Sequence, residues 1–218
     1  MSRRTAAAIC QIASPLVFLA ALATYPAGSD QLTTAGAHPS RWALAALLEC
    51  VSGALALPGA VGVASFLAAR GRTLAFLGTI GIGLGVVFFG AGVPMNVATA
   101  TLGDQLPHAQ GQHVLDALHD SPFLAGVLAL YLFDVVGTLL LLGGAVRGRL
   151  VHWWTLVLAV VGVVATGAVD SAGPLLVGLQ LLVAVPAVAL GVALLRAGGS
   201  PSAGAPDEQQ AVSSARAS

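Results

Sequence analysis

Apolar residues fill the chain in long blocks that short polar stretches separate. A helix needs about 20 predominantly apolar residues to cross the hydrocarbon core of a bilayer. The blocks are apolar all round and lack the alternation, with a period of two, that marks the strands of a membrane β-barrel. The pattern therefore predicts an all-α fold, a polytopic six-helix transmembrane bundle with spans over Ala6–Tyr25, Trp42–Ala69, Thr73–Ala100, Pro122–Val146, Val151–Asp170 and Gly173–Arg196.

The two ends of the chain allow further interpretation. Arg3 and Arg4, the apolar run Ile9–Leu22 and an Ala21-Leu22-Ala23 step together resemble a cleavable signal peptide. Because five more blocks follow, we favour an uncleaved first helix. Residues 197–218 are small and polar, which predicts a disordered cytoplasmic tail after the membrane domain of residues 1–196.

Composition excludes the soluble classes. Hydrophobic residues make up 57% of the 218 residues and charged residues only 8%, with a mean hydropathy of +0.90. A soluble domain carries about 25% charged residues. Nine basic and nine acidic residues cancel, so no surplus of positive charge exists to neutralise phosphates, and nucleic acid is not an expected partner.

The basic residues predict the topology. All nine are arginines, and two Arg-Gly-Arg turns, Arg70–Arg72 and Arg147–Arg149, follow the second and fourth blocks. If the N-terminus is cytoplasmic, eight of the nine arginines lie inside, with Arg41 as the exception. The positive-inside rule therefore favours an N-in/C-in topology. The absence of lysine is typical of a GC-rich genome, so we expect a bacterial cytoplasmic (inner) membrane.

Asp134 is the strongest candidate for a functional residue. It stands 13 residues before Arg147, which places it about 20 Å up the helix, near the middle of the bilayer. Gln180 reaches a similar depth on the last block, while Tyr131 and Thr138 share the Asp134 face at i−3 and i+4. We expect Asp134 either to bind a proton or solute in a cavity, or to tie two helices together by hydrogen bonding.

A second polar layer is predicted near the outer interface. Glu49, Asn96 and Asp170 would lie there and could line a mouth that attracts a cation or an amine. We favour the simpler interpretation that they meet headgroups and water. Trp42, Trp153 and Trp154 fit the positions of interfacial anchors.

The outer loop between the third and fourth blocks holds the histidines. Residues from Gln110 to His119 predict a short amphipathic helix that would place His113, Asp116 and Asp120 on one face. Imidazole and carboxylate groups can bind zinc or copper. Because no HExxH or paired ligand motif is present, we favour a solvated loop and predict no metal and no cofactor.

Small residues recur at helical spacing in two blocks. The positions are Ser52, Ala56, Ala60, Ala64 and Ala68 in the second block and Gly78, Gly81 and Gly85 in the third. Such faces permit close helix packing. They could join a second copy or another membrane protein, but we favour packing within one bundle. Membrane lipids are the expected partners.

The segment Arg41–Val87, with its Ser-Arg-Trp start, its Arg-Gly-Arg turn and its glycine-rich return helix, resembles uncharacterised six-span integral membrane proteins of GC-rich bacteria. The sequence RGRLVHWW in Arg147–Trp154 is similar to the same group. The resemblance implies the six-span fold but no activity. Our first expectation is a non-enzymatic accessory or small-solute-interacting protein. The alternatives are a proton-linked small-solute transporter centred on Asp134 and a membrane-integral enzyme acting on a lipid or isoprenoid.

Overall fold

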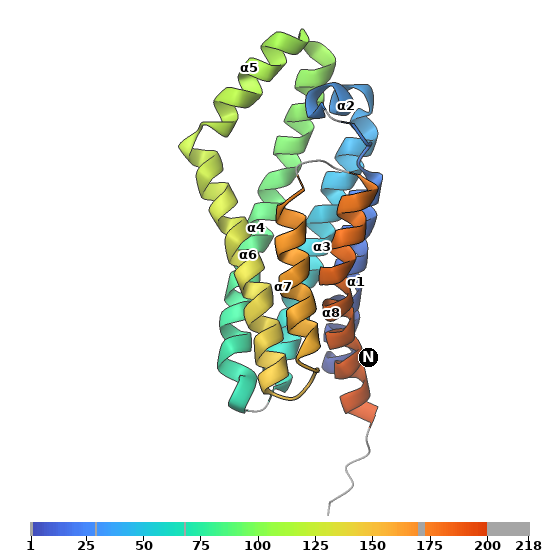
Figure 1. Cartoon of the computed structure of the whole chain (residues 1–218), viewed down its shortest axis with the longest axis vertical. Helices are drawn as coiled ribbons and strands as arrows, with labels where there is room; N and C mark the ends of the chain where they lie inside the picture. The colour runs from blue at the N-terminus through green and yellow to red at the C-terminus, as the bar shows by residue number, and fades with distance from the viewer. Residues whose placement is uncertain (1, 29, 68, 170–172, 200–218) are drawn as a thin grey trace, which may run out of the picture.

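The computed structural model describes residues 2–28, 30–67, 69–169 and 173–199. In this part of the chain every regular element is a helix, which confirms the predicted all-α class (Figure 1). The helices are α1 (Arg3–Thr24), α2 (Gln31–Ala37), α3 (Pro39–Phe66), α4 (Ala69–Gln105), α5 (His108–His119), α6 (Pro122–Arg147), α7 (Trp154–Gly167) and α8 (Pro174–Gly199).

Five of these helices, namely α1, α3, α4, α6 and α8, are long and apolar enough to cross a membrane. The predicted fifth span over Val151–Asp170 is shorter in the structure, because α7 has only 14 residues and is therefore about 21 Å long. The preceding turn shortens its start, since Arg149 adopts a positive φ of 58°. Asp170 and the tail from residue 200 onward lie outside the described residues.

Six helices form a ring around a central axis, in the order α6, α4, α3, α1, α8 and α7. The most extensive contacts join α4 to α6 and α1 to α3, whereas the α6–α7 seam that closes the ring has the fewest contacts. The described ends of α1 and α8 meet at the same end of the bundle, where the Arg4 Nε donates a hydrogen bond of 2.8 Å to the Leu194 carbonyl (Figure 1).

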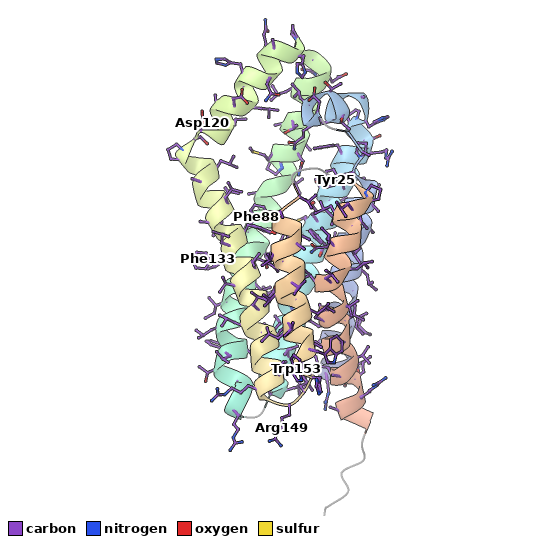
Figure 2. The ribbon with its side chains drawn as sticks, in the orientation of Figure 1. Tyr25, Phe88, Asp120, Phe133, Arg149 and Trp153 are labelled. Carbon is purple, nitrogen blue, oxygen red and sulfur yellow. The ribbon has the colours of Figure 1, made fainter. Side chains whose placement is uncertain are left out.

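The two ends of the bundle carry opposite charges. Both Arg-Gly-Arg sequences lie together at one end, where Gly71 contacts the backbone of Gly144 and Gly148. We call this the arginine end. The predicted turn at Arg70–Arg72 is wrong, because these residues form the first turn of helix α4, whereas Gly148 and Arg149 do form a turn after α6. Arg149 lies at the arginine end, whereas Asp120 lies toward the other end, which α2 and α5 cover (Figure 2). We call that the acidic end, because Asp30, Asp104, Asp116 and Asp120 belong to it.

Glycines hold α4 and α6 in backbone contact. A Cβ atom on Gly78 would stand 2.6 Å from the Gly137 carbonyl oxygen, and one on Gly81 would stand 2.6 Å from the Phe133 oxygen. Only glycine permits so close an approach. The glycine face of Gly78, Gly81 and Gly85 therefore packs within one chain, as the favoured interpretation predicts.

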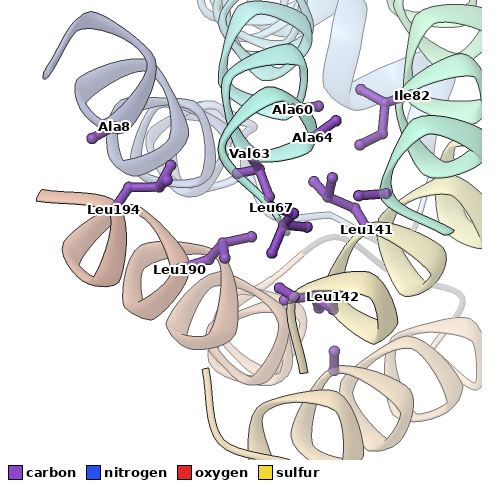
Figure 3. Close-up of a cluster of buried hydrophobic side chains, with 13 residues drawn as sticks. Ala8, Ala60, Val63, Ala64, Leu67, Ile82, Leu141, Leu142, Leu190 and Leu194 are labelled. Atoms are coloured by element: carbon purple, nitrogen blue, oxygen red, sulfur yellow. The ribbon is translucent and has the colours of Figure 1, made fainter. Parts of the chain in front are cut away.

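The core is made of small and branched side chains near the arginine end of the ring. Val63, Leu67, Leu141, Leu142 and Leu190 from α3, its C-terminal turn, α6 and α8 point toward one another (Figure 3). Outside the ring, large apolar side chains are exposed, and Phe133 on α6 points away from the bundle (Figure 2). An apolar exterior of this kind is what a helix bundle surrounded by lipid requires.

Two short helices cover the acidic end. The predicted helix over Gln110–His119 is confirmed as α5 and begins two residues earlier, at His108. The sequence analysis missed α2, although Asp30 is a strong N-cap residue. Its carboxylate accepts hydrogen bonds from the backbone N–H groups of Leu32 and Thr33, at 3.0 and 3.3 Å.

Candidate functional site: a cavity inside the helix ring

The ring encloses a cavity of about 280 Å³. Side chains from α1, α3, α4, α6, α7 and α8 line it, so that each helix of the ring contributes. Most of the lining is apolar, and Leu141, Leu142 and Leu190 close it toward the arginine end. The cavity is partly open, and two of its lining residues, Tyr131 on α6 and Gly167 on α7, are exposed.

The cavity brings together the polar residues that the sequence singled out near mid-membrane depth. Asp134, Tyr131 and Thr138 on α6 and Gln180 on α8 all line it. Their helices make few direct contacts, and the residues share a site because the ring curves both helices around the same space. Whether these residues bind a solute or a proton remains a prediction.

Asp134 occupies its position because α4 has a glycine opposite it. The carboxyl group lies directly over Gly85, where a Cβ atom would collide with the Asp134 side chain. The side chain is half-buried, and it has neither a hydrogen-bond partner nor an ion pair among the described residues. An acidic group without a partner in an apolar bundle is costly, and such groups are usually functional.

Gln11 is a cavity residue that the sequence analysis missed. It lies on α1 against the backbone of the α3 residue Gly59, and only 8% of its surface is exposed. Its amide forms no hydrogen bond within the described part of the chain. The amide atoms keep accessible surface, because no buried side-chain nitrogen or oxygen among the described residues lacks a partner, so the amide is open to the cavity that Gln11 lines. The signal was available, because Gln11 interrupts the first apolar block.

Two serines add a polar wall between α1 and α3. The Ser52 hydroxyl donates to the Ser14 carbonyl oxygen at 2.8 Å, and the two hydroxyls lie 3.3 Å apart. Both residues line the cavity. Ser52 was predicted to lie on a small-residue face, and it meets α1 at Ser14. Further along that face, Ala56 lines the cavity, and Ala60 and Ala64 belong to the buried core.

Aromatic rings lie above the serines, toward the acidic end. Phe18 on α1 and Phe89 on α4 both line the cavity and meet edge to face, with ring centroids 5.9 Å apart. The Phe89 ring packs on Gly53, where an added Cβ would stand 2.9 Å from it. Phe88 extends this aromatic group to Tyr131, at a centroid distance of 5.3 Å.

Glu49 and Asn96 are close together, but they form a separate cluster. The Tyr25 hydroxyl interacts with both side chains, and the Trp42 Nε1 donates to the Asn96 Oδ1 at 2.9 Å. Neither Glu49 nor Asn96 lines the cavity. Trp42 is only 5% exposed, so the prediction that it anchors the chain at the membrane interface is wrong: the ring is held inside by Asn96 and by edge contact with Tyr25. Trp153 and Trp154 are exposed.

The histidines of the acidic end do not converge on a metal site. Within the described residues, no group of three or more His, Cys, Asp or Glu side chains could hold a metal ion. Asp116 accepts a hydrogen bond of 2.8 Å from Gln112 in the same helix. His108 pairs instead with Asp30, at 3.5 Å. His113 and Asp120 do not line the polar pocket between α2 and α5, whereas Asp116 does.

The chain matches no protein-family model, no curated protein and no solved structure. The chemistry of the cavity is therefore the basis for assigning a function.

Proposed function

We propose that this chain is an integral membrane protein that binds a small solute in the cavity inside its helix ring. One observation carries the proposal: the cavity gathers a carboxyl group and two side-chain amides, from Asp134, Gln11 and Gln180, that form no hydrogen bond or ion pair among the described residues. Ligand pockets are concave and mostly apolar, with a few polar groups that fix orientation. A volume of about 280 Å³ suits a small organic molecule.

The test is to fill the cavity and compare a matched variant on the same helix. Ala56 on α3 lines the cavity, whereas Ala54, two residues earlier, is exposed. The melting temperature of each variant in lipid nanodiscs is measured against a panel of small amines, alcohols and carboxylates. We expect compounds that stabilise the wild type and Ala54→Phe to leave Ala56→Phe unshifted. Equal shifts in both variants, or no shift with any compound, would contradict solute binding and favour the accessory role.

We also propose that the chain crosses the membrane six times, with both ends in the cytoplasm of a bacterial cell. α6 ends at the arginine end and α8 starts at the opposite one (Figure 1), so the segment that contains α7 has to return across the bundle. We assign the rest of this crossing to the described residues that flank α7, 148–153 and 168–169.

Cysteine labelling tests this orientation. The free cysteines Cys10 and Cys50 are first replaced by serine. A membrane-impermeant maleimide should then label Gln112→Cys in intact spheroplasts and Arg149→Cys only in inside-out vesicles. The reverse pattern would contradict the N-in/C-in arrangement.

Proton-linked transport is the second candidate, and the unpaired Asp134 carboxyl group favours it. Wild-type protein in liposomes should drive uptake of a stabilising compound under a pH gradient, and Asp134→Asn should abolish that uptake while retaining the fold. Uptake that is equal in both proteins would refute the coupling. An enzyme that uses two acids has less support, because Glu49 lies outside the cavity that holds Asp134.

A further inference from the structure

The charge inside the cavity has one sign. Among the described residues that line it, Asp134 is the one charged side chain, and none is arginine, lysine or histidine. The described arginines lie near the ends of helices or in a turn, with the segments Arg70–Arg72 and Arg147–Arg149 packed together at the arginine end. A negatively charged solute would therefore meet a carboxyl group and no compensating cation. A desolvated pair of like charges is strongly unfavourable.

The remaining polar groups of the lining are suited to receive donors. Gln11 and Gln180 carry amide oxygens, and Ser14, Thr138 and Thr166 carry hydroxyl groups that can accept as well as donate. An ammonium group has donors and no acceptor. Carboxylate, amide and hydroxyl oxygens can all accept from it.

A metal ion fits this cavity poorly. Calcium takes six to eight oxygen ligands, and magnesium requires near-octahedral geometry. The cavity offers a single carboxylate, and its lining is mostly apolar, with leucines at the arginine end and the rings of Phe18, Phe89 and Tyr131. Apolar walls instead suit the carbon body of an organic ligand, and the faces of aromatic rings attract cations.

We propose that the occupant of the cavity is a small, monovalent organic cation whose ammonium group pairs with Asp134 and whose apolar body lies against the aromatic and leucine lining. This inference rests on the proposed solute-binding function and adds the chemical class of the solute. The cavity is partly open, and its lining residues Tyr131 and Gly167 are exposed, which gives such a molecule a way in.

Three probes of similar size and different charge test the class. Isothermal titration at pH 7 measures the binding of phenethylammonium, phenethyl alcohol and phenylacetate to wild-type protein in phosphatidylcholine nanodiscs, with empty nanodiscs subtracted. We expect phenethylammonium to bind roughly tenfold or more tightly than the other two, a difference of about 1.4 kcal/mol. This comparison needs no variant and therefore does not depend on the folding of one.

Two variants then assign the charge. Asp134→Asn keeps the shape and removes the carboxylate, and it should weaken phenethylammonium binding roughly tenfold or more. The control Asp104→Asn removes an exposed carboxylate at the acidic end of α4 and should leave binding unchanged. Binding of the alcohol or phenylacetate at least as tightly as the amine, unchanged binding in Asp134→Asn, or no binding of any probe would overturn the cation proposal. The Ala56→Phe comparison tests a different point, because it asks only whether any solute enters the cavity. If that comparison succeeds and the charge tests do not, the cation proposal is overturned and the solute-binding function still stands.

Discussion

The backbone contact between α4 and α6 predicts that replacing a glycine of α6 by alanine lowers the free energy of unfolding at one position and raises it at another. A Cβ atom on Gly137 would stand 2.7 Å from both the Gly78 oxygen and the Ile82 nitrogen, whereas ordinary contact begins at 3.4 Å. Both neighbours are backbone atoms and cannot rotate away, so Gly137→Ala must separate the helices by about 0.7 Å, and overpacking of this kind costs about 1–3 kcal/mol.

Gly143 on the same helix is the matched control, because an added Cβ there meets nothing within 4 Å. Alanine restricts the unfolded chain more than glycine does, so Gly143→Ala should stabilise the protein by about 0.4–1 kcal/mol. The free energy of unfolding is measured by SDS titration in mixed micelles. Changes of the same sign and size in the two variants would refute the close packing of α4 against α6.

Two predictions concern the acidic end of the bundle. The Thr33 hydroxyl donates to Asp30 and holds the pKa of that carboxyl below its usual value of 3.8, with help from the backbone of Thr33 and Leu32 and from His108. The carboxylate therefore stabilises α2 above pH 3.8 and loses this effect as the pH falls through its lowered pKa. Hydrogen exchange of the α2 amides, corrected for intrinsic rates, should accelerate in acid in the wild type. In Asp30→Asn the exchange should lose this dependence on pH. Asn96→Leu removes the acceptor of the Trp42 indole N–H and should lower the free energy of unfolding by about 0.5–1.5 kcal/mol. SDS titration measures this difference. Equal stability of the wild type and the variant would show that the hydrogen bond contributes nothing.

Hydropathy predicted the helical class and the approximate bounds of most long helices, because a helix in lipid must be apolar along its whole length. Periodicity could not predict where α7 begins, since the positive φ of Arg149 and the turn through Trp153 are local backbone features inside an apolar stretch. The Asp30 cap of α2 is visible in the sequence, but such a short helix has too few residues to show a pattern.

The candidate site was only partly visible in the sequence. Depth measured from the arginines placed Asp134 and Gln180 at similar levels, and helical spacing added Tyr131 and Thr138. The sequence could not show which helices curve around one space, so it left out Gln11, whose amide lies in the same cavity. The same lack of helix order left open whether Glu49 lines a mouth at the outer interface, whereas the structure places it beside Tyr25 in a cluster apart from the cavity.

The most direct test of the account is to locate a bound cation in the molecule. Crystals of the protein grown with para-bromophenethylammonium would give an anomalous signal from bromine. We predict one peak inside the helix ring, against the aromatic and leucine lining, with the ammonium group within hydrogen-bonding distance of the Asp134 carboxylate. A peak on the lipid-facing surface, or an empty cavity at a probe concentration that saturates binding in solution, would contradict the account.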